Sequence, residues 1–426
     1  MRILLTCHYF PPEIGAPQAR LSALAAAWAA DGDTVTVLTG MPNHPTGVIP
    51  PRYRGAVRRR ERRDGYRVIR TWLYATPNEG IARKTLGHLS FMLSSVLLGG
   101  RASGPADVVV VSSPTFFSIG SAWLLARLKR ARLVIEVRDL WPAIFVELGV
   151  LTNRRLIAVL ERLELAAYAA ADAVVVVSEG FRADLIRRGV PPGKVHTIRN
   201  GVSLAEFDPD APADPEVRAR LGAGPGDCLV LYAGTHGISH GLTAVADAAA
   251  LLTGEAVRFA FVGEGSHKPR LQARVAELGL TSVTMLPGVP HGEVPALLAA
   301  ADICLVPLRD VPLFATFIPS KIFEYLGAGK AVVGSVAGEA AQILREAGAV
   351  VVAPEDSHAM AREIRALAAD RARRLAIGRT GRAHAERCFD RVALAREYRK
   401  ILEATGSPDD RGARMTGKTP MTGEQR

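Results

Sequence analysis

Residues 307–330 read PLRDVPLFATFIPSKIFEYLGAGK and lead directly into the apolar run Ala331–Gly334. Within this stretch we expect Ser320 to cap the start of a helix and Gly329 to end it. A β-branched run, Ile303–Val306, stands just before the stretch. The order is therefore strand, helix, strand, which is typical of a right-handed crossover in a parallel sheet.

The same alternation extends in both directions along the 426 residues. Ala- and Leu-rich segments with helical spacing, such as Ala19–Ala30 and Leu156–Ala169, separate short apolar runs. We expect strands in these runs at 3–6, 34–39, 68–72, 108–112, 133–137 and 173–178, and again at 228–233, 257–262, 283–286, 303–306, 331–334 and 349–352. The pattern predicts an α/β protein with two Rossmann-like, doubly wound domains that face a central cleft.

A Pro- and Asp-rich segment, Asp208–Pro215, breaks both periodicities and marks the border between the two series. We therefore expect one domain at 1–205 and a second at 206–388. A C-terminal helix at 389–405 follows, and its return to the first domain stays open. Residues 406–426 are polar and rich in Gly, Pro and Thr, so we expect a disordered tail.

Composition excludes several classes of protein. Hydrophobic residues make up 48% and charged residues 22%, which is ordinary globular usage and excludes a disordered or collagenous chain. The four cysteines stand far apart, which argues against a disulfide framework or a zinc module and fits the reducing cytoplasm. The N-terminus lacks the apolar core of a signal peptide, and the longest weakly charged stretch, Leu86–Gly100, is too short to span a bilayer. We therefore expect a cytoplasmic protein.

Glycine-bearing loops follow several of the expected strands. Such loops expose main-chain amides to phosphate groups at the carboxyl ends of parallel strands. Each loop alone is a weak signal, because turn geometry also accounts for its glycine. The loops contain Gly15 before the first helix, then Gly234, Thr235, His236 and His240, and finally Gly263 and Lys268.

The order and spacing of several short segments resemble the family-4 retaining glycosyltransferases of the GT-B fold. The resemblance extends to about residue 405 and rests on Asn200–Val202, Tyr232–Gly234, Phe261–Gly265, Leu286–Val289, Ala301–Ile303 and Lys321–Lys330. Tyr9–Gly15 and Met41–Gly47 look like a subgroup of bacterial O-antigen and capsule enzymes, some of which use N-acetylfucosamine-type donors. The resemblance implies a nucleotide sugar on the second domain, an acceptor on the first, and retention of the anomeric configuration. We expect a UDP-linked donor and a saccharide or polyprenyl-diphosphate-linked acceptor.

The resemblance also assigns residues around the donor ribose and sugar. The family pairs one Glu with another Glu eight positions later, and the second Glu binds the ribose hydroxyls. Glu324 matches the second position, whereas Thr316 stands at the first. The resemblance therefore implies that the amides and the hydroxyl around Ala315–Phe317, including Thr316, contact the donor sugar.

The cations around the diphosphate differ from those of many relatives, which place an Arg and a Lys where this chain has Thr235 and His240. Lys268, Arg270 and Lys321 are the nearest cations, and together with helix N-termini they suit a diphosphate leaving group. The candidate donor-binding residues are Gly15, Gly234, Thr235, His236, His240, Gly263, Lys268, Val289, Thr316, Phe317, Lys321 and Glu324.

The candidate catalytic residues are Asp139 and Arg138, which end the expected strand at 133–137 and face the acceptor in this interpretation. Asp139 would orient or deprotonate the acceptor hydroxyl, although a structural carboxylate is an equally good interpretation. We expect neither a cofactor nor a metal ion. Asp208-Pro209-Asp210 resembles a metal-binding DxD motif, but it lies in the linker rather than at a strand end.

A basic segment and an apolar stripe stand near each other in the first domain. The net charge is +11, and Arg52–Arg70 alone carries a surplus of seven positive charges. We expect peripheral contact with the anionic inner face of the cell membrane. A core helix beside a solvated basic loop is the alternative. The stripe consists of Leu86, Leu89, Met92, Leu93, Val96 and Leu97.

Two other classes of function fit part of the pattern. A nonhydrolysing sugar-nucleotide 2-epimerase would share the fold and the nucleotide site but lack the subgroup motifs. A non-enzymatic polyanion-binding protein would use the Arg52–Arg70 patch as a nucleic-acid surface. No aromatic-rich nucleic-acid module accompanies that patch, so nucleic acid is not an expected partner.

Overall fold

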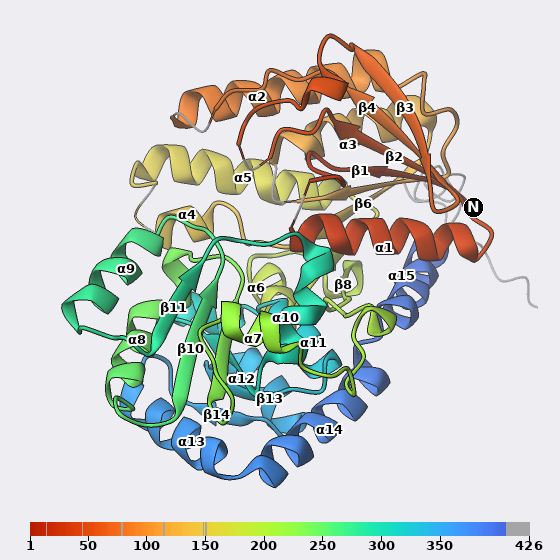
Figure 1. Cartoon of the computed structure of the whole chain (residues 1–426). Helices are drawn as coiled ribbons and strands as arrows, with labels where there is room; N and C mark the ends of the chain where they lie inside the picture. Colours follow the sequence, from red (N-terminus) through yellow and green to blue (C-terminus); the bar gives the residue numbers. More distant parts are fainter. Residues whose placement is uncertain are drawn as a thin grey trace, which may run out of the picture.

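The computed structural model describes residues 1–405 apart from Ile14, Pro45, 78–79, 114–115, Leu148 and Val150. The expected tail at 406–426 lies outside the described residues. The chain forms two α/β halves, one above the other in Figure 1, each built on its own sheet. The α/β class with two parallel-sheet domains is confirmed.

The first half contains an eight-stranded sheet in the order β3-β4-β2-β1-β5-β6-β7-β8. Neighbouring strands are parallel except for β3 and β4, which are antiparallel. The strands are β1 (Arg2–Thr6), β2 (Thr34–Gly40), β3 (Arg58–Arg63), β4 (Tyr66–Thr71), β5 (Val108–Ser112), β6 (Arg132–Val137), β7 (Ala173–Val176) and β8 (Val195–Thr197). The helical segments are α1 (Ala16–Ala30), η1 (Pro51–Tyr53), α2 (Ile81–Ser94), η2 (Ser95–Gly99), α3 (Phe116–Lys129), α4 (Ala143–Glu147), α5 (Arg154–Ala170), α6 (Glu179–Arg187) and η3 (Pro192–Lys194).

The second half contains a six-stranded parallel sheet in the order β11-β10-β9-β12-β13-β14. The strands are β9 (Cys228–Ala233), β10 (Val257–Val262), β11 (Val283–Leu286), β12 (Ile303–Pro307), β13 (Ala331–Ser335) and β14 (Val350–Val352). The helical segments are η4 (Leu204–Glu206), α7 (Pro215–Arg220), η5 (Ile238–His240), α8 (Leu242–Ala250), α9 (Lys268–Glu277), η6 (His291–Glu293), α10 (Val294–Ala300), η7 (Pro312–Thr316), α11 (Lys321–Gly327), α12 (Gly338–Glu346), α13 (Ser357–Ala369), α14 (Arg371–Cys388) and α15 (Arg391–Ala404).

The strand order in each sheet explains where a ligand would bind. The order in which successive strands join the sheet reverses between β1 and β5 in the first sheet, and between β9 and β12 in the second. Ligands of doubly wound sheets bind at this switch point, beyond the carboxyl ends of the strands. The loops that follow β1 and β9 are the glycine-bearing loops of Gly15 and Gly234.

Two expectations from the sequence are corrected. Ser320 has helical backbone angles and its hydroxyl makes no capping bond, so α11 begins without a side-chain cap. The basic run Arg58–Arg63 is the edge strand β3, because each of its residues pairs with β4. Its charges hide the apolar alternation that predicts a strand. Gly329 follows α11 with a φ of 64°, as expected of a helix-ending glycine.

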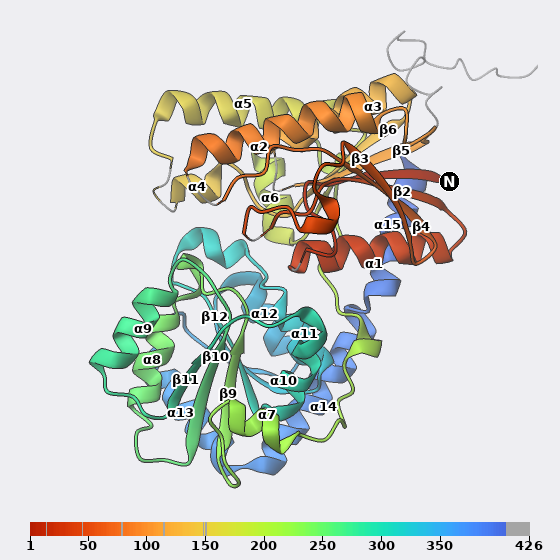
Figure 2. The same cartoon turned by 45° about the horizontal axis from the view of Figure 1, so that its top comes forward.

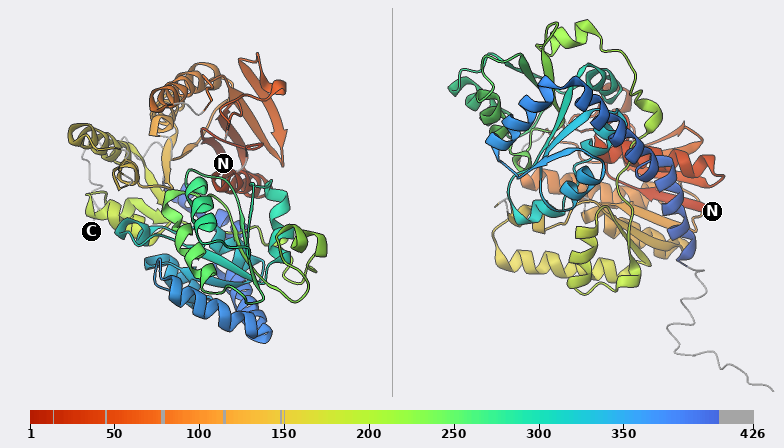
Figure 3. Two further views of the ribbon diagram at one scale, coloured as in Figure 1. Left: turned by 60° about the vertical axis from the view of Figure 1, so that its left-hand side comes forward. Right: turned by 90° about the horizontal axis from the view of Figure 1, so that it is seen from below.

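Helix α15 lies beside α1 of the first half, so the chain ends against the domain in which it began (Figure 2). The indole Nε1 of Trp28 donates a 2.9 Å hydrogen bond to the carbonyl of Ala395, and the Trp28 ring packs against Tyr398. Arg399 forms an ion pair with Asp33 on the same side. Figure 3, seen from below, shows α14 and α15 running from the second half to the first.

Candidate functional site

The carboxyl ends of the two sheets meet on one side of the molecule. The Ser178 hydroxyl, beyond the end of β7, donates a 2.9 Å hydrogen bond to the carbonyl of Thr316. Glu339 of α12 accepts hydrogen bonds from the Gly180 amide and, at 3.0 and 2.7 Å, from the Arg199 guanidinium. These contacts hold the two strand-end edges face to face.

A cavity of about 730 Å³ lies between α1 and the loops of the second half. Gly15 and Gln18 line it from α1, and Glu206, His291 and Arg391 line it from the other side. The side-chain Oε1 of Gln18 and the Nε of Arg391 are buried and have no hydrogen-bond partner among the described residues. Buried polar groups of this kind are ordinarily satisfied by water or a ligand.

Glu324 lies on α11, and its carboxylate interacts electrostatically with His291 and Arg391, which line this cavity. Burial raises the pKa of Glu324, while the charges of His291 and Arg391 lower it. His291 donates to Glu206 at 3.0 Å, and this bond raises the pKa of His291. The carboxylate is half-buried, as a group that binds ribose hydroxyls would be.

Lys321 occupies a buried position one turn before Glu324. Its Nζ stands 3.8 Å from the ring centre of Tyr232, and burial lowers its pKa to about 7. A Cβ atom at Gly234 would lie 3.1 Å from the Cε of Lys321, and the φ of Gly234 is 138°. Glycine is therefore required where the loop after β9 passes the lysine.

Two histidines flank the same lysine. The rings of His236 and His240 pack against Tyr232 at centroid distances of 5.7 and 6.1 Å. Burial, and to a smaller extent the charges of Lys268 and Lys321, lower the pKa of His236 to about 4. Burial, and to a smaller extent the charge of Lys321, lower the pKa of His240 to about 3. Both rings are therefore neutral at pH 7 and offer N–H groups rather than charge. Both ring nitrogens of His236 are buried with no partner among the described residues.

The loops after β9 and β10 pack closely together. A Cβ atom at Gly263 would lie 1.8 Å from the carbonyl oxygen of Gly234, so this position also requires glycine. Lys268 donates to the carbonyl of Gly263 at 2.9 Å and to Leu286 at 3.2 Å, and pairs with Glu264. The lysine thus joins two loops, whereas the Nζ of Lys321 would lie 3.2 Å from a Cβ atom at Gly234.

The remaining donor-binding candidates lie in two settings. Thr235 is exposed beside Gly234, and Val289 is half-buried after β11. The Thr316 hydroxyl bonds the carbonyl of Leu313, and the Phe317 ring packs against Phe181 of the first half at 5.6 Å. Thr316 and Phe317 therefore join the two halves.

The candidate catalytic residues lie just beyond β6. Asp139 is half-buried, and burial raises its pKa against the opposing effect of Arg138. The Nε and Nη1 of Arg138 are buried with no hydrogen-bond partner among the described residues. The charges of Glu136 and Asp139 act on this guanidinium. Its two nitrogens without a partner among the described residues are suited to an anionic or hydroxyl-rich ligand.

A buried ion pair that the sequence does not predict lies next to these residues. Arg20 of α1 donates to Glu136 of β6 at 2.9 Å, and both side chains are almost fully buried. Arg20 also bonds the carbonyls of Ile198 and Arg199, so it anchors α1 below the cleft. The signal that could have found the pair is a single carboxylate inside an otherwise apolar strand.

The described residues contain neither a membrane-spanning helix nor a cluster of metal-binding side chains. None of the helices is both long and apolar enough to cross a bilayer. No group of three or more His, Cys, Asp or Glu side chains in the described part of the chain is arranged to hold a metal ion.

Family models match both halves of the chain. Residues 15–201 match the "Glycosyl transferase 4-like domain", and residues 227–370 match "Glycosyl transferases group 1". The matches cover well over half of the chain, which belongs to the glycosyltransferases of the GT-B fold. The expected GT-B fold and glycosyltransferase family are confirmed, whereas the narrower subgroup of O-antigen and capsule enzymes stays a prediction.

Individual relatives resemble the chain over most of its length. WcaI of Escherichia coli (strain K12), a glycosyl transferase named for colanic acid biosynthesis, is 29% identical over 410 residues, which are 93% of this chain and 98% of WcaI. Sucrose-phosphate synthase of Thermosynechococcus elongatus superposes with a TM-score of 0.74 at 23% identity, over 95% of this chain and 99% of its own. HepE of Anabaena, solved in complex with UDP and glucose, superposes with a TM-score of 0.70 at 19% identity, over 95% of this chain and 100% of its own.

Proposed function

We propose that this glycosyltransferase moves a sugar from a UDP-linked donor to a saccharide or lipid-linked saccharide, with retention, in the synthesis of a cell-surface polysaccharide. The observation that carries the proposal is the position of Lys321 and Glu324, one turn apart on α11, beside the glycine loop of Gly234. The name of WcaI supports the polysaccharide product, and the UDP complex of HepE supports the donor.

The described residues divide the reaction between the two halves. The Glu324 carboxylate would accept hydrogen bonds from the ribose hydroxyls. Lys321 and the amides near Gly234 would stabilise the negative charge that develops on the diphosphate as the bond between the sugar and phosphate breaks. Asp139 would orient the acceptor hydroxyl whose oxygen forms the new bond to the sugar.

A panel of nucleotide sugars tests this function. We expect nucleotide release from a UDP-sugar that depends on an added lipid-linked or free saccharide. Conversion of the donor to its 2-epimer without an acceptor would instead support the epimerase, which the comparisons do not favour. Absence of nucleotide binding would contradict the proposal as a whole.

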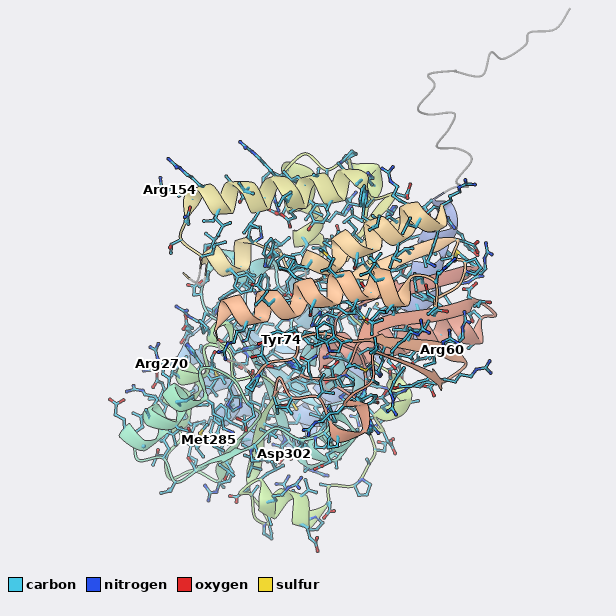
Figure 4. All side chains as sticks on the ribbon, turned by 90° about the horizontal axis from the view of Figure 1, so that it is seen from above. Arg60, Tyr74, Arg154, Arg270, Met285 and Asp302 are labelled. Atoms are coloured by element: carbon cyan, nitrogen blue, oxygen red, sulfur yellow. The ribbon has the colours of Figure 1, made fainter. Side chains whose placement is uncertain are left out.

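We also propose that the enzyme binds the anionic inner face of the cell membrane through α2. Leu86, Leu93 and Leu97 of the expected stripe are 55%, 58% and 77% exposed. Leu89, Met92 and Val96 are half-buried, and Val96 packs against the core of the first half, so one edge of the stripe faces solvent and the other faces the core. Figure 4 looks onto this face and shows α2, α3 and α5 side by side, with Arg154 at one end and Arg60 at the other. Exposed apolar side chains continue across α3 and α5 at Trp123, Leu124, Leu128, Leu156, Val159 and Leu163.

The basic strand β3 adjoins the end of this apolar face. The guanidinium of Arg58 donates a 3.0 Å hydrogen bond to the carbonyl of Leu98, just past the stripe. Each Arg near an anionic leaflet contributes about 1 kcal/mol, so a few of them give attachment that salt weakens.

Sedimentation with liposomes tests the membrane contact. We expect the protein to pellet with anionic vesicles but not with neutral ones, and to detach in high salt. Replacing Arg58, Arg59, Arg60, Arg62 and Arg63 with Ser should abolish pelleting. A control that replaces five exposed arginines of the second half, Arg362, Arg371, Arg373, Arg379 and Arg387, should still pellet. Equal pelleting with both kinds of vesicle, or none with either, would contradict the contact.

A further inference from the structure

Three histidines from separate segments meet at the carboxyl edge of the first sheet. His8 follows β1, His44 follows β2, and His88 lies on α2. The ring centres of His8 and His88 are 4.4 Å apart, and their Nδ1 atoms are 3.4 Å apart. Tyr9 joins the group, with its ring 4.4 Å from His8 and 5.2 Å from His44. None of these residues belongs to the donor site described above.

The charge around these rings is positive. Lys84 stands one turn before His88 on α2. Burial is the larger cause that lowers the pKa of both His44 and His88, and the charge of Lys84 lowers both pKa values further. Burial also lowers the pKa of His8 well below its ordinary value. At pH 7 the cluster therefore contains neutral imidazoles next to one ammonium group.

The carboxylate near this cluster is Glu13, and its oxygens are already engaged. They accept main-chain hydrogen bonds from Phe10 at 2.9 Å and from Asn43 and His44 at 2.8 Å. The Lys84 side chain is exposed at this edge. An ammonium group with imidazole N–H donors beside it is a setting that suits a phosphate group.

Helix α2 also connects this cluster to the exposed apolar stripe. Lys84 and His88 are four residues apart and so share one side of the helix, whereas Leu86 and Leu93 point to solvent. Tyr74, which Figure 4 labels beneath α2, donates its main-chain amide to Ser90 of the same helix at 2.7 Å. The polar cluster and the apolar stripe are thus two sides of a single helix.

We propose that Lys84, His88 and His44 form a second anion site, which binds the diphosphate group of an isoprenoid-linked acceptor while the acceptor chain lies along the exposed side of α2. The proposal rests on the proposed function, because it assigns the acceptor of that reaction. A diphosphate at this position would place the attached saccharide at the carboxyl edge of the first sheet, opposite the donor half. The same groups would distinguish a lipid diphosphate from a free saccharide.

Calorimetric titration with farnesyl diphosphate tests the site. Saturating UDP is present, so that the nucleotide site is occupied and cannot take the probe. We expect the wild-type protein to bind the probe, and the double variant Lys84→Gln, His88→Gln to bind it at least tenfold more weakly. Farnesol, which lacks the diphosphate, should bind both proteins equally.

A matched control removes one positive charge from the same outer face. Arg127→Gln takes away a cation that lies over the Trp123 ring of α3, away from the histidines, and should leave the affinity for farnesyl diphosphate within twofold. Equal affinity of the wild type and the Lys84→Gln, His88→Gln variant would overturn the proposal, as would a failure of the wild-type protein to bind the probe while UDP is saturating. UDP binding is titrated separately, so a failure of the donor site is seen by itself.

Discussion

The two halves present different chemistry to the cleft between them. The second half places a buried ammonium group, Lys321, against the Tyr232 ring and beside glycines that bring the main chain close. The first half presents the Arg138 guanidinium, two of whose nitrogens have no hydrogen-bond partner among the described residues, together with the half-buried carboxylate of Asp139. It also presents a group of histidines whose pKa values burial lowers. In the proposed reaction the second half would hold the diphosphate and the first half would hold the acceptor.

Among the tests of this difference between the halves, Glu324→Gln should have the largest effect, a loss of affinity for the nucleotide sugar. A glutamine keeps only one accepting oxygen, and hydrogen bonds to a charged group are each worth roughly 1.5–3 kcal/mol. We expect affinity for the nucleotide sugar to fall by about tenfold to a hundredfold. Asp139→Asn in the first half is the control and should leave donor affinity unchanged. Unchanged affinity in Glu324→Gln would mean that the carboxylate does not bind the ribose and only stabilises the N-terminal end of α11.

The pH dependence of donor affinity should be the next largest effect. Burial lowers the pKa of Lys321 from 10.5 to about 7, whereas the flanking His236 and His240, with pKa values of about 4 and about 3, stay neutral throughout. Binding of a nucleotide sugar should favour the protonated lysine, so affinity should fall by up to about tenfold per pH unit above 7. Lys321→Met should bind weakly and show a flat profile. A sloped profile in that variant would assign the titration to a group other than Lys321.

The stability of the free protein should change with pH in the opposite direction. The pKa of Lys321 is lower in the folded chain than in the unfolded chain, so the unfolded chain binds more protons between pH 7 and 10.5. Stability therefore rises with pH across this window, and Lys321→Met should remove that part of the rise. Thermal unfolding at several pH values measures it.

Gly180→Ala tests the contact between the halves and should have a smaller effect. A Cβ atom at Gly180 would lie 2.8 Å from the Cβ of Thr316, and such overpacking costs about 1–3 kcal/mol. Alanine in helix α6 gains up to about 1 kcal/mol of helix propensity, so the net loss of stability is modest. We expect turnover to fall severalfold while donor affinity holds. Gly193→Ala, where no atom lies within 4 Å of the new Cβ, is the control; equal turnover in both variants would contradict the role of this contact.

The sequence predicts the fold well because parallel strands are buried on both faces and show as continuous apolar runs. The expected strands at 108–112 and 257–262 match β5 and β10 residue for residue. The edge strand β3 was missed because its residues are almost all arginine, and an exposed edge does not require apolar side chains. Short β8 was also missed, since three residues carry no detectable alternation.

The site was only partly predictable for a different reason. The glycine-bearing loops and α11 each follow a strand of the second half, so the alternation of strands and helices already places them at one edge of that sheet. The pair Arg20 and Glu136 joins residues 116 positions apart, and the cluster of His8 and His88 joins residues 80 apart. No local pattern carries such contacts, because they depend on how α1 and α2 pack against the sheet.

The smallest expected effect is that of a chelator, which should leave turnover unchanged. In the second half Lys321 already supplies positive charge to the site, and an arriving diphosphate raises the pKa of that lysine by the same attraction that stabilises the leaving group. A divalent ion would repeat what the lysine and the amides near Gly234 provide. We expect full transfer activity in excess EDTA, measured against the same preparation supplied with magnesium or manganese. Loss of activity that either ion restores would show that the cationic side of the cleft is incomplete without a metal, and the contrast between the halves would then rest on the ion rather than on Lys321.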